Sequence, residues 1–150
     1  MVPTQAPFSE RQAYLAVILS WLIAQSFKVM RGIRKEKRFD FRWFLNSGGM
    51  PSSHSAAVSS LTTVVGFYYG FGSVPFGVCL VYSLIIMFDA AGVRRSVGRQ
   101  AVILNKIVDQ LSKGQVIEEQ RLKALLGHTP KEVFVGAFLG ILVSIIFRLI

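Results

Sequence analysis

The 150-residue chain is 52% hydrophobic and 17% charged, a composition that departs from that of ordinary soluble domains. Its length fits one domain, and 17 Lys and Arg against eight Asp and Glu give a net charge of +9. Such a charge suits nucleic acid, anionic lipid or a phosphorylated substrate, and the long apolar blocks favour lipid over nucleic acid. One cysteine, Cys79, excludes an intrachain disulfide. We therefore expect residues 1–150 to form a single integral membrane domain.

The first apolar block, residues 13–30, could be mistaken for a cleaved signal peptide. However, the preceding residues lack a basic region, since Arg11 is offset by Glu10, and a strongly basic stretch follows the block. We interpret it as a retained transmembrane span.

Four segments approach the about 20 apolar residues that a transmembrane helix needs. They are residues 13–30, 55–71, 74–89 and 133–150. The second is rich in Ser and Thr, so we expect neighbouring helices to surround it. A short Gly- and Pro-containing link joins it to the third, as in a tight helical hairpin. The sequence predicts an all-α polytopic membrane bundle of about four spans. Four spans make a thin bundle, which favours pairing into a homodimer.

Lys and Arg are concentrated in two loops, residues 31–54 and 90–132. Because basic loops stay on the cytoplasmic side, both loops are expected there, with the two termini opposite. We expect an integral protein of the cell membrane or of a plastid-type inner membrane, with its active site on the cytoplasmic side.

The second loop contains a helical pattern of its own. Leu104, Ile107, Val108 and Leu111 recur at helical spacing with polar residues on the other face, and a second helical stretch covers about residues 115–126. This predicts a cytoplasmic amphipathic helical hairpin that either caps the bundle or lies in the headgroup region.

A first group of candidate site residues lies where the first basic loop enters the second span. Gly49 follows another glycine and lets the backbone approach a ligand, while Ser52 and Ser53 lie at the start of a helix. Unpaired N–H groups and the helix dipole there favour an anion, with His54 one position further. The alternative is an ordinary capped helix with a histidine at the interface.

The second histidine, His128, precedes the fourth span at the same predicted membrane face. Glu132 is four residues further on, so its carboxylate can accept a hydrogen bond from the imidazole. Such a partner fixes the tautomer and leaves the other ring nitrogen to attack. Alternatively, Glu132 merely complements the helix N-terminus.

Charged residues near the ends of the first and third spans complete the group. Arg94 and Arg95 could chelate phosphate oxygens, Lys28 could bind the same phosphate, and Asp89 could hold an arginine or Lys28 in place. Paired arginines at a cytoplasmic helix end and a snorkelling lysine are the simpler explanations. The sequence has no metal-binding cluster and no nucleotide-binding loop, so we expect no metal and no other cofactor.

These segments resemble the type 2 phosphatidic acid phosphatases, which share their site with vanadium haloperoxidases, and specifically a small divergent branch of that family. Pro51-Ser52-Ser53-His54 resembles the motif Pro-Ser-Gly-His, with Ser in place of Gly. His128-Thr129-Pro130-Lys131-Glu132 resembles the motif His-x-x-x-Asp, with Glu in place of Asp. A further motif of the family has Lys seven residues before Arg-Pro, and of it only Lys28 carries over, since Lys35 stands at the arginine position and no proline follows. In the family an arginine lies six residues before the histidine of His-x-x-x-Asp, and here that position is Leu122. We therefore assign the role of this arginine to Arg94 or Arg95.

The resemblance implies that His128 is the nucleophile, that Glu132 orients it and that His54 protonates the leaving alcohol. Lys28, Arg94 or Arg95, and Ser53 would stabilise the transferring phosphoryl group. It implies a phosphatase that acts on a phosphomonoester or pyrophosphate headgroup of a phospholipid or polyprenyl phosphate. Phosphatidylglycerophosphate and phosphatidate both fit. The alternative is a non-catalytic membrane protein that binds anionic lipid or a protein partner through its basic cytoplasmic face.

Overall fold

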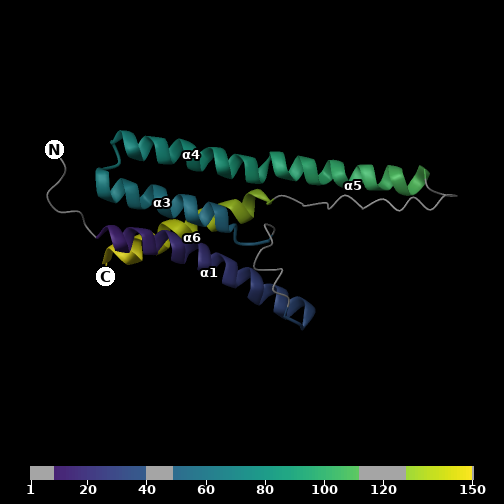
Figure 1. The fold of residues 1–150 in the computed structure, drawn as a ribbon, viewed down its shortest axis with the longest axis horizontal. Helices are drawn as coiled ribbons and strands as arrows, with labels where there is room; N and C mark the ends of the chain where they lie inside the picture. Colours follow the sequence, from purple (N-terminus) through teal and green to yellow (C-terminus); the bar gives the residue numbers. More distant parts are fainter. Residues whose placement is uncertain (1–8, 40–48, 112–127, 150) are drawn as a thin grey trace.

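The computed structural model of the chain describes residues 9–39, 49–111 and 128–149. Within these residues the regular elements are all helices, which confirms the all-α prediction. The helices, labelled as in Figure 1, are α1 (Glu10–Glu36), α3 (Ser53–Tyr69), α4 (Val74–Ala91), α5 (Val93–Leu111) and α6 (Pro130–Leu149). The second half of the expected hairpin lies outside the described residues.

Local signals fix the helix ends. Ser9 and Gln12 form a capping box at the start of α1, and Lys37 adopts the left-handed conformation that ends it, with φ of 52°. Ser73 caps α4, whose first turn contains a proline. The four apolar segments of the sequence lie in α1, α3, α4 and α6.

Three stretches of the described chain are long and apolar enough to cross a membrane: Glu10–Glu36, Val74–Asp109 and Pro130–Leu149. Helix α3 has 17 residues and is not among them, so the expected count of four spans is not confirmed. The integral membrane character is supported by the other three.

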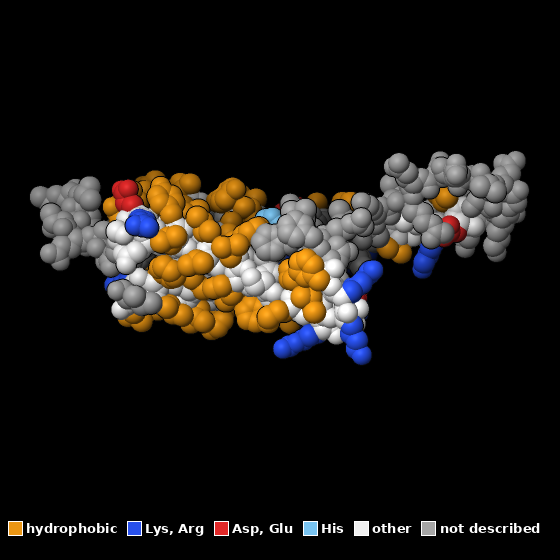
Figure 2. Space-filling model, turned by 60° about the horizontal axis from the view of Figure 1, so that its bottom comes forward, with side chains coloured by type: hydrophobic (Ala, Val, Ile, Leu, Met, Phe, Trp, Pro, Cys, Tyr) orange, Lys and Arg blue, Asp and Glu red, His pale blue; other side chains and the backbone are white. Residues whose placement is uncertain are grey.

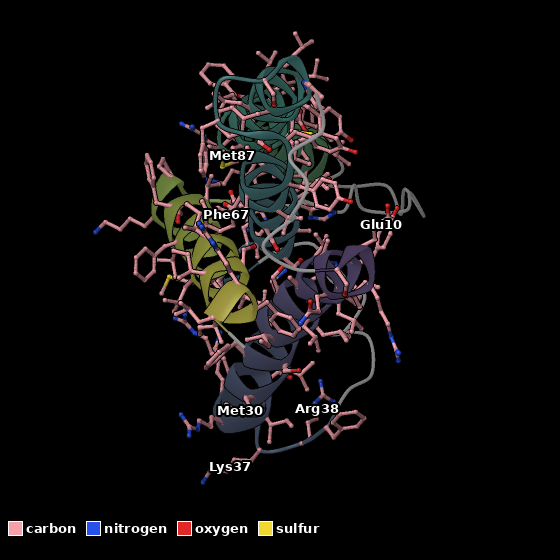
Figure 3. All side chains as sticks on the ribbon, turned by 90° about the vertical axis from the view of Figure 1, so that its left-hand side faces the viewer. Glu10, Met30, Lys37, Arg38, Phe67 and Met87 are labelled. Carbon is pink, nitrogen blue, oxygen red and sulfur yellow. The ribbon has the colours of Figure 1, made fainter. Side chains whose placement is uncertain are left out.

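Helix α3 lies at the centre of the bundle. It packs against α1, α4 and α6, whereas α4 contacts α6 only weakly. Viewed along the bundle, α3 separates α4 from α1 and α6 (Figure 3). Ten of its residues are buried, against two in α4. The prediction that neighbouring helices surround this Ser- and Thr-rich segment is therefore confirmed.

Small residues allow α3 and α6 to approach at backbone distance. A Cβ atom on Gly136 would overlap the carbonyl oxygen of Ser52, and one on Gly140 would overlap that of Ala56. One turn further, the hydroxyls of Ser60 and Ser144 are 2.8 Å apart. Close approach with a hydroxyl contact is typical of helix pairs in lipid.

Hydroxyl groups also join α3 to its other neighbours. The hydroxyl of Ser20 on α1 donates to the carbonyl of Ala56 at 3.3 Å, and Thr62 lies 2.7 Å from Ser83 of α4. Each such bond contributes only about 0.6 kcal/mol in a membrane. The bundle therefore depends on many small contacts along α3 and not on one strong pair.

The surface divides into an apolar belt and charged ends (Figure 2). Exposed large side chains such as Val78, Tyr82 and Ile85 cover α4, where lipid would meet them. Lys35, Lys37 and other basic residues lie at the end of α1, away from the two ends of the described chain. This distribution matches a bundle embedded in a bilayer.

Helix α5 continues from α4 beyond the bundle (Figure 1). It contacts α4 alone among the described helices and is strongly amphipathic, with exposed Val97, Ile103 and Ile107. Helix α5 therefore does not cover the end of the bundle, and its expected position in the headgroup region stays a prediction.

Candidate phosphate site

Three helix ends meet at one end of the bundle. The Ser52 backbone N–H donates to the carbonyl of Glu132 at 3.0 Å, which joins the start of α3 to the first turn of α6. The His128 N–H donates to the carbonyl of Ala90 at 3.1 Å, which joins the segment just before α6 to the end of α4. Segments that are distant in sequence are thus held together by backbone bonds, which do not depend on side-chain type.

His128 lies immediately before the cap of α6 and is 4% exposed. Its Nδ1 is 3.1 Å from Oε2 of Glu132, the contact that the spacing of the two residues predicts. The same carboxylate oxygen accepts the Thr129 N–H at 3.0 Å, while the Thr129 hydroxyl accepts the Glu132 N–H at 3.4 Å. This capping box fixes Glu132, which in turn orients the imidazole of His128 through Nδ1.

Lys28 reaches the same region from α1. Its side chain is 7% exposed, and Nζ donates to the Ser53 hydroxyl at 3.1 Å. The Glu132 carboxylate attracts its ammonium group. Gly49, with φ of 96°, lies beside it: a Cβ there would come 3.9 Å from Cγ of Lys28. A buried cation at membrane depth is costly, which makes Lys28 a candidate functional residue.

The start of α3 supplies the polar groups opposite Lys28. Ser52 caps the helix and accepts hydrogen bonds from the Ser55 N–H at 3.4 Å and the Ser55 hydroxyl at 3.0 Å. Ser52, Ser53 and Ser55 are all buried, whereas His54 in the same turn is exposed. The dipoles of α3 and α6 both present their positive ends here. Together with Lys28, they make this end of the bundle suited to an anion such as phosphate.

The sequence model of the divergent PAP2 family matches residues 9–143 of the chain. The chain belongs to the divergent PAP2 family. It is also 37% identical over 143 residues to the uncharacterized membrane protein YuiD of Bacillus subtilis, a match that covers 88% of this chain and 90% of that protein. No solved structure matches the chain. The resemblance to a divergent branch of the phosphatidic acid phosphatases is confirmed.

The structure of this divergent PAP2 protein brings most of the predicted site residues to one end of the bundle. Lys28 contacts Ser53, and His128 contacts Glu132. These two pairs are linked through the bond between Ser52 and Glu132. The sequence predicted which residues would share a membrane face but did not predict the backbone bonds that hold them there.

Other predicted residues lie around this centre. Asp89 lines a shallow depression with Phe88 and Val93 at the junction of α4 and α5, and its expected role as a holding group stays a prediction. The side chains of Arg94 and Arg95 are outside the described part of the structure, so the arginine of the site also stays a prediction. Among the described residues, no group of three His, Cys, Asp or Glu side chains could hold a metal ion.

Proposed function

We propose that the protein is a membrane phosphatase that hydrolyses a phosphomonoester or pyrophosphate lipid headgroup at the cytoplasmic leaflet through a phosphohistidine intermediate. The observation that carries the proposal is the pair of the buried His128 and the half-buried Glu132, held 3.1 Å apart by a capping box. The buried cation Lys28 at the same end supplies the charge that a phosphate needs.

The reaction proceeds in two steps. In the first, Nε2 of His128 attacks phosphorus, the N–P bond forms and the P–O bond to the lipid breaks. His54 donates its proton to the departing oxygen. In the second, a water molecule attacks phosphorus and gives a proton to His54, and the N–P bond breaks to release inorganic phosphate. Both imidazoles return to their starting states, so the cycle balances.

Lys28, the Ser53 hydroxyl and backbone N–H groups at the start of α3 stabilise the charge on the transferring phosphoryl group. Phosphoryl transfer depends mainly on positioning and charge stabilisation, which are the properties of this site. Either Arg94 or Arg95 is the further residue that binds the oxygens of the phosphoryl group. Glu132 holds the histidine in one tautomer and favours the cationic ring that forms during the reaction.

The test is phosphate release by the purified protein in vesicles that contain phosphatidate, phosphatidylglycerophosphate or a polyprenyl phosphate. His128→Ala should reduce the release by at least about 10³-fold, because the nucleophile is lost. Tyr82→Ala, which truncates an exposed side chain on α4, should change it little. Mass spectrometry after a rapid acid-free quench should find the phosphoryl group on His128.

Release that is unaffected by His128→Ala would overturn the mechanism. If no lipid phosphate is hydrolysed, the protein is the non-catalytic alternative, which binds anionic lipid or a partner through its basic face.

A further inference from the structure

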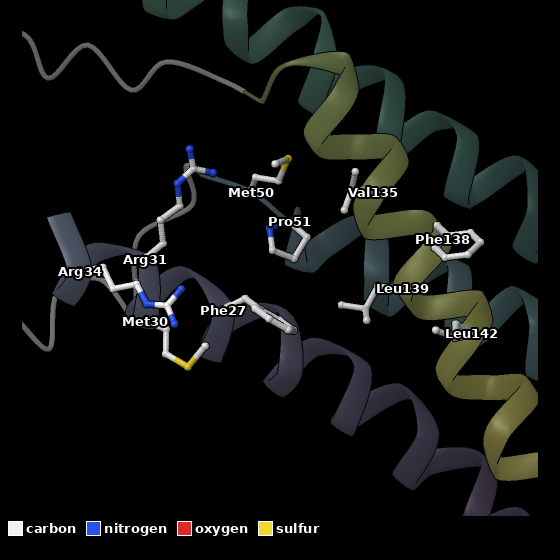
Figure 4. A pocket seen from close by; sticks show the side chains of 10 residues that line it. All are labelled: Phe27, Met30, Arg31, Arg34, Met50, Pro51, Val135, Phe138, Leu139 and Leu142. Atoms are coloured by element: carbon white, nitrogen blue, oxygen red, sulfur yellow. The ribbon is translucent and has the colours of Figure 1, made fainter.

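An apolar groove lies between α1 and α6, beside the proposed site (Figure 4). Its volume of about 500 Å³ is within the range of small-molecule sites. Phe27 and Met30 line it from α1, and Leu139 and Leu142 line it from α6. The site described above uses none of these side chains.

The groove and the proposed phosphate site share their walls. Pro51 lines the groove and directly precedes Ser52, the cap of α3. Phe27 lines the groove and directly precedes Lys28, whose ammonium group contacts Ser53. Consecutive residues therefore face two neighbouring spaces, and a molecule that occupies the groove has its end next to the phosphate-binding groups.

Charge is confined to one end of the groove. Arg31 and Arg34 lie at this end, whereas the lining from Val135 to Leu142 is apolar (Figure 4). Both arginines are exposed, and the guanidinium group matches the geometry of phosphate oxygens. An apolar channel with two arginines at its mouth is complementary to a hydrocarbon chain that carries an anionic headgroup.

The dimensions fit part of one lipid chain. The eight residues from Val135 to Leu142 extend over about 10 Å of helix axis, about a third of the hydrocarbon core of a bilayer. Because lipid tails are as apolar as the groove, moving a chain into it gains little hydrophobic free energy. Selection of one lipid over another must then come from the arginines.

We propose that this groove is the lateral entrance for an anionic phospholipid, with an acyl chain between α1 and α6 and its phosphate bound first by Arg31 and Arg34. This inference rests on the proposed function, because it makes the occupant the substrate of the Lys28 and His128 site. It adds to the proposed function the route by which the lipid enters and the two arginines that bind its phosphate first.

The test uses phosphatidate with a photoreactive diazirine near the glycerol end of one acyl chain, in vesicles that contain the full-length protein. Light should attach this probe to peptides of α1 and α6, and phosphatidylcholine with the same chain should label them less. Arg31→Ala and Arg34→Ala should each reduce the preference for phosphatidate by about fivefold. Arg38→Ala, which removes an arginine paired with Glu36, is the matched control and should have no such effect.

Free inorganic phosphate in millimolar excess should not displace the probe, which separates a lipid site from a site for phosphate alone. Equal labelling by both lipids, labelling confined to α4, or a preference that survives both arginine substitutions would overturn the inference.

Hydrolysis is measured in the same vesicles, so that the two proposals fail separately. His128→Ala should abolish hydrolysis and retain the labelling. Labelling without hydrolysis in the unaltered protein would leave the groove as a lipid site and reject the phosphatase. Hydrolysis of phosphatidate without labelling of α1 and α6 would reject the groove alone.

Discussion

Substitution of Gly136 by alanine should reduce phosphate release strongly although the residue is not at the reacting atoms. Its added Cβ would lie 3.1 Å from both N and C of Ser52 and nearer still to the carbonyl oxygen. Carbon contacts are optimal at about 3.5–4.0 Å, so α6 must move away from α3. The movement stretches the 3.0 Å bond between Ser52 and Glu132 and displaces His128. A misplacement of about 1 Å costs about 10²-fold in rate.

The measurement compares Gly136→Ala with Gly77→Ala in reconstituted vesicles. Gly77 lies on α4 with nothing within 4 Å of an added Cβ, so it controls for the change in helix propensity. Gly136→Ala should also lower the thermal midpoint, since overpacking a helix contact costs about 1–3 kcal/mol. Equal phosphate release and equal thermal midpoints in the two variants would refute the reasoning, because the close α3 and α6 contact would then be unnecessary.

Three further predictions concern the site and its orientation. Glu132→Gln should reduce phosphate release by roughly 10²–10⁴-fold, because an amide can hold His128 in the wrong tautomer; release within a factor of two of the unaltered protein would contradict this. Lys28→Met should reduce release by about 10²-fold without lowering the thermal midpoint, because a buried charge is removed together with its desolvation cost. A lower midpoint with normal release would make Lys28 structural. In a background without the native cysteine, a membrane-impermeant maleimide should label Lys37→Cys from the cytoplasmic side and Gly72→Cys from outside; the reverse pattern would invert the orientation.

The sequence predicted the helices and the pairing of His128 with Glu132 because both depend on local information. Apolar runs set the positions of α1, α3, α4 and α6, and a spacing of four residues places two side chains on one helix face. The 3.1 Å contact between these two residues is a consequence of such spacing. The identity of the lipid and the side of the membrane on which the site lies are not local properties. Both stay proposals.

The pairing of the helices could not be read from hydropathy, since a helix in lipid is apolar on every face. A different signal was present: Ser52, Ala56 and Ser60 recur at intervals of four, as do small residues at 136, 140 and 144. These are the positions at which α3 and α6 meet. The sequence did not predict that Arg31 and Arg34 line a groove, because basic residues that follow a span are equally well explained by the orientation of that span in the membrane.

The contact between Lys28 and Ser53 has a consequence for how the protein enters the membrane. Lys28 lies on the first helix, and the hydroxyl that binds it lies on the next helix of the bundle. If the helices insert in chain order, α1 stands briefly in lipid with a charged side chain that costs about 2.5–3.5 kcal/mol. The contact with Ser53 of α3 then reduces this cost, so Lys28, which is proposed to bind phosphate, also favours the packing of α3 against α1. The proposed phosphate site is complete only when α6 adds His128, so in this order of insertion the proposed activity arises last.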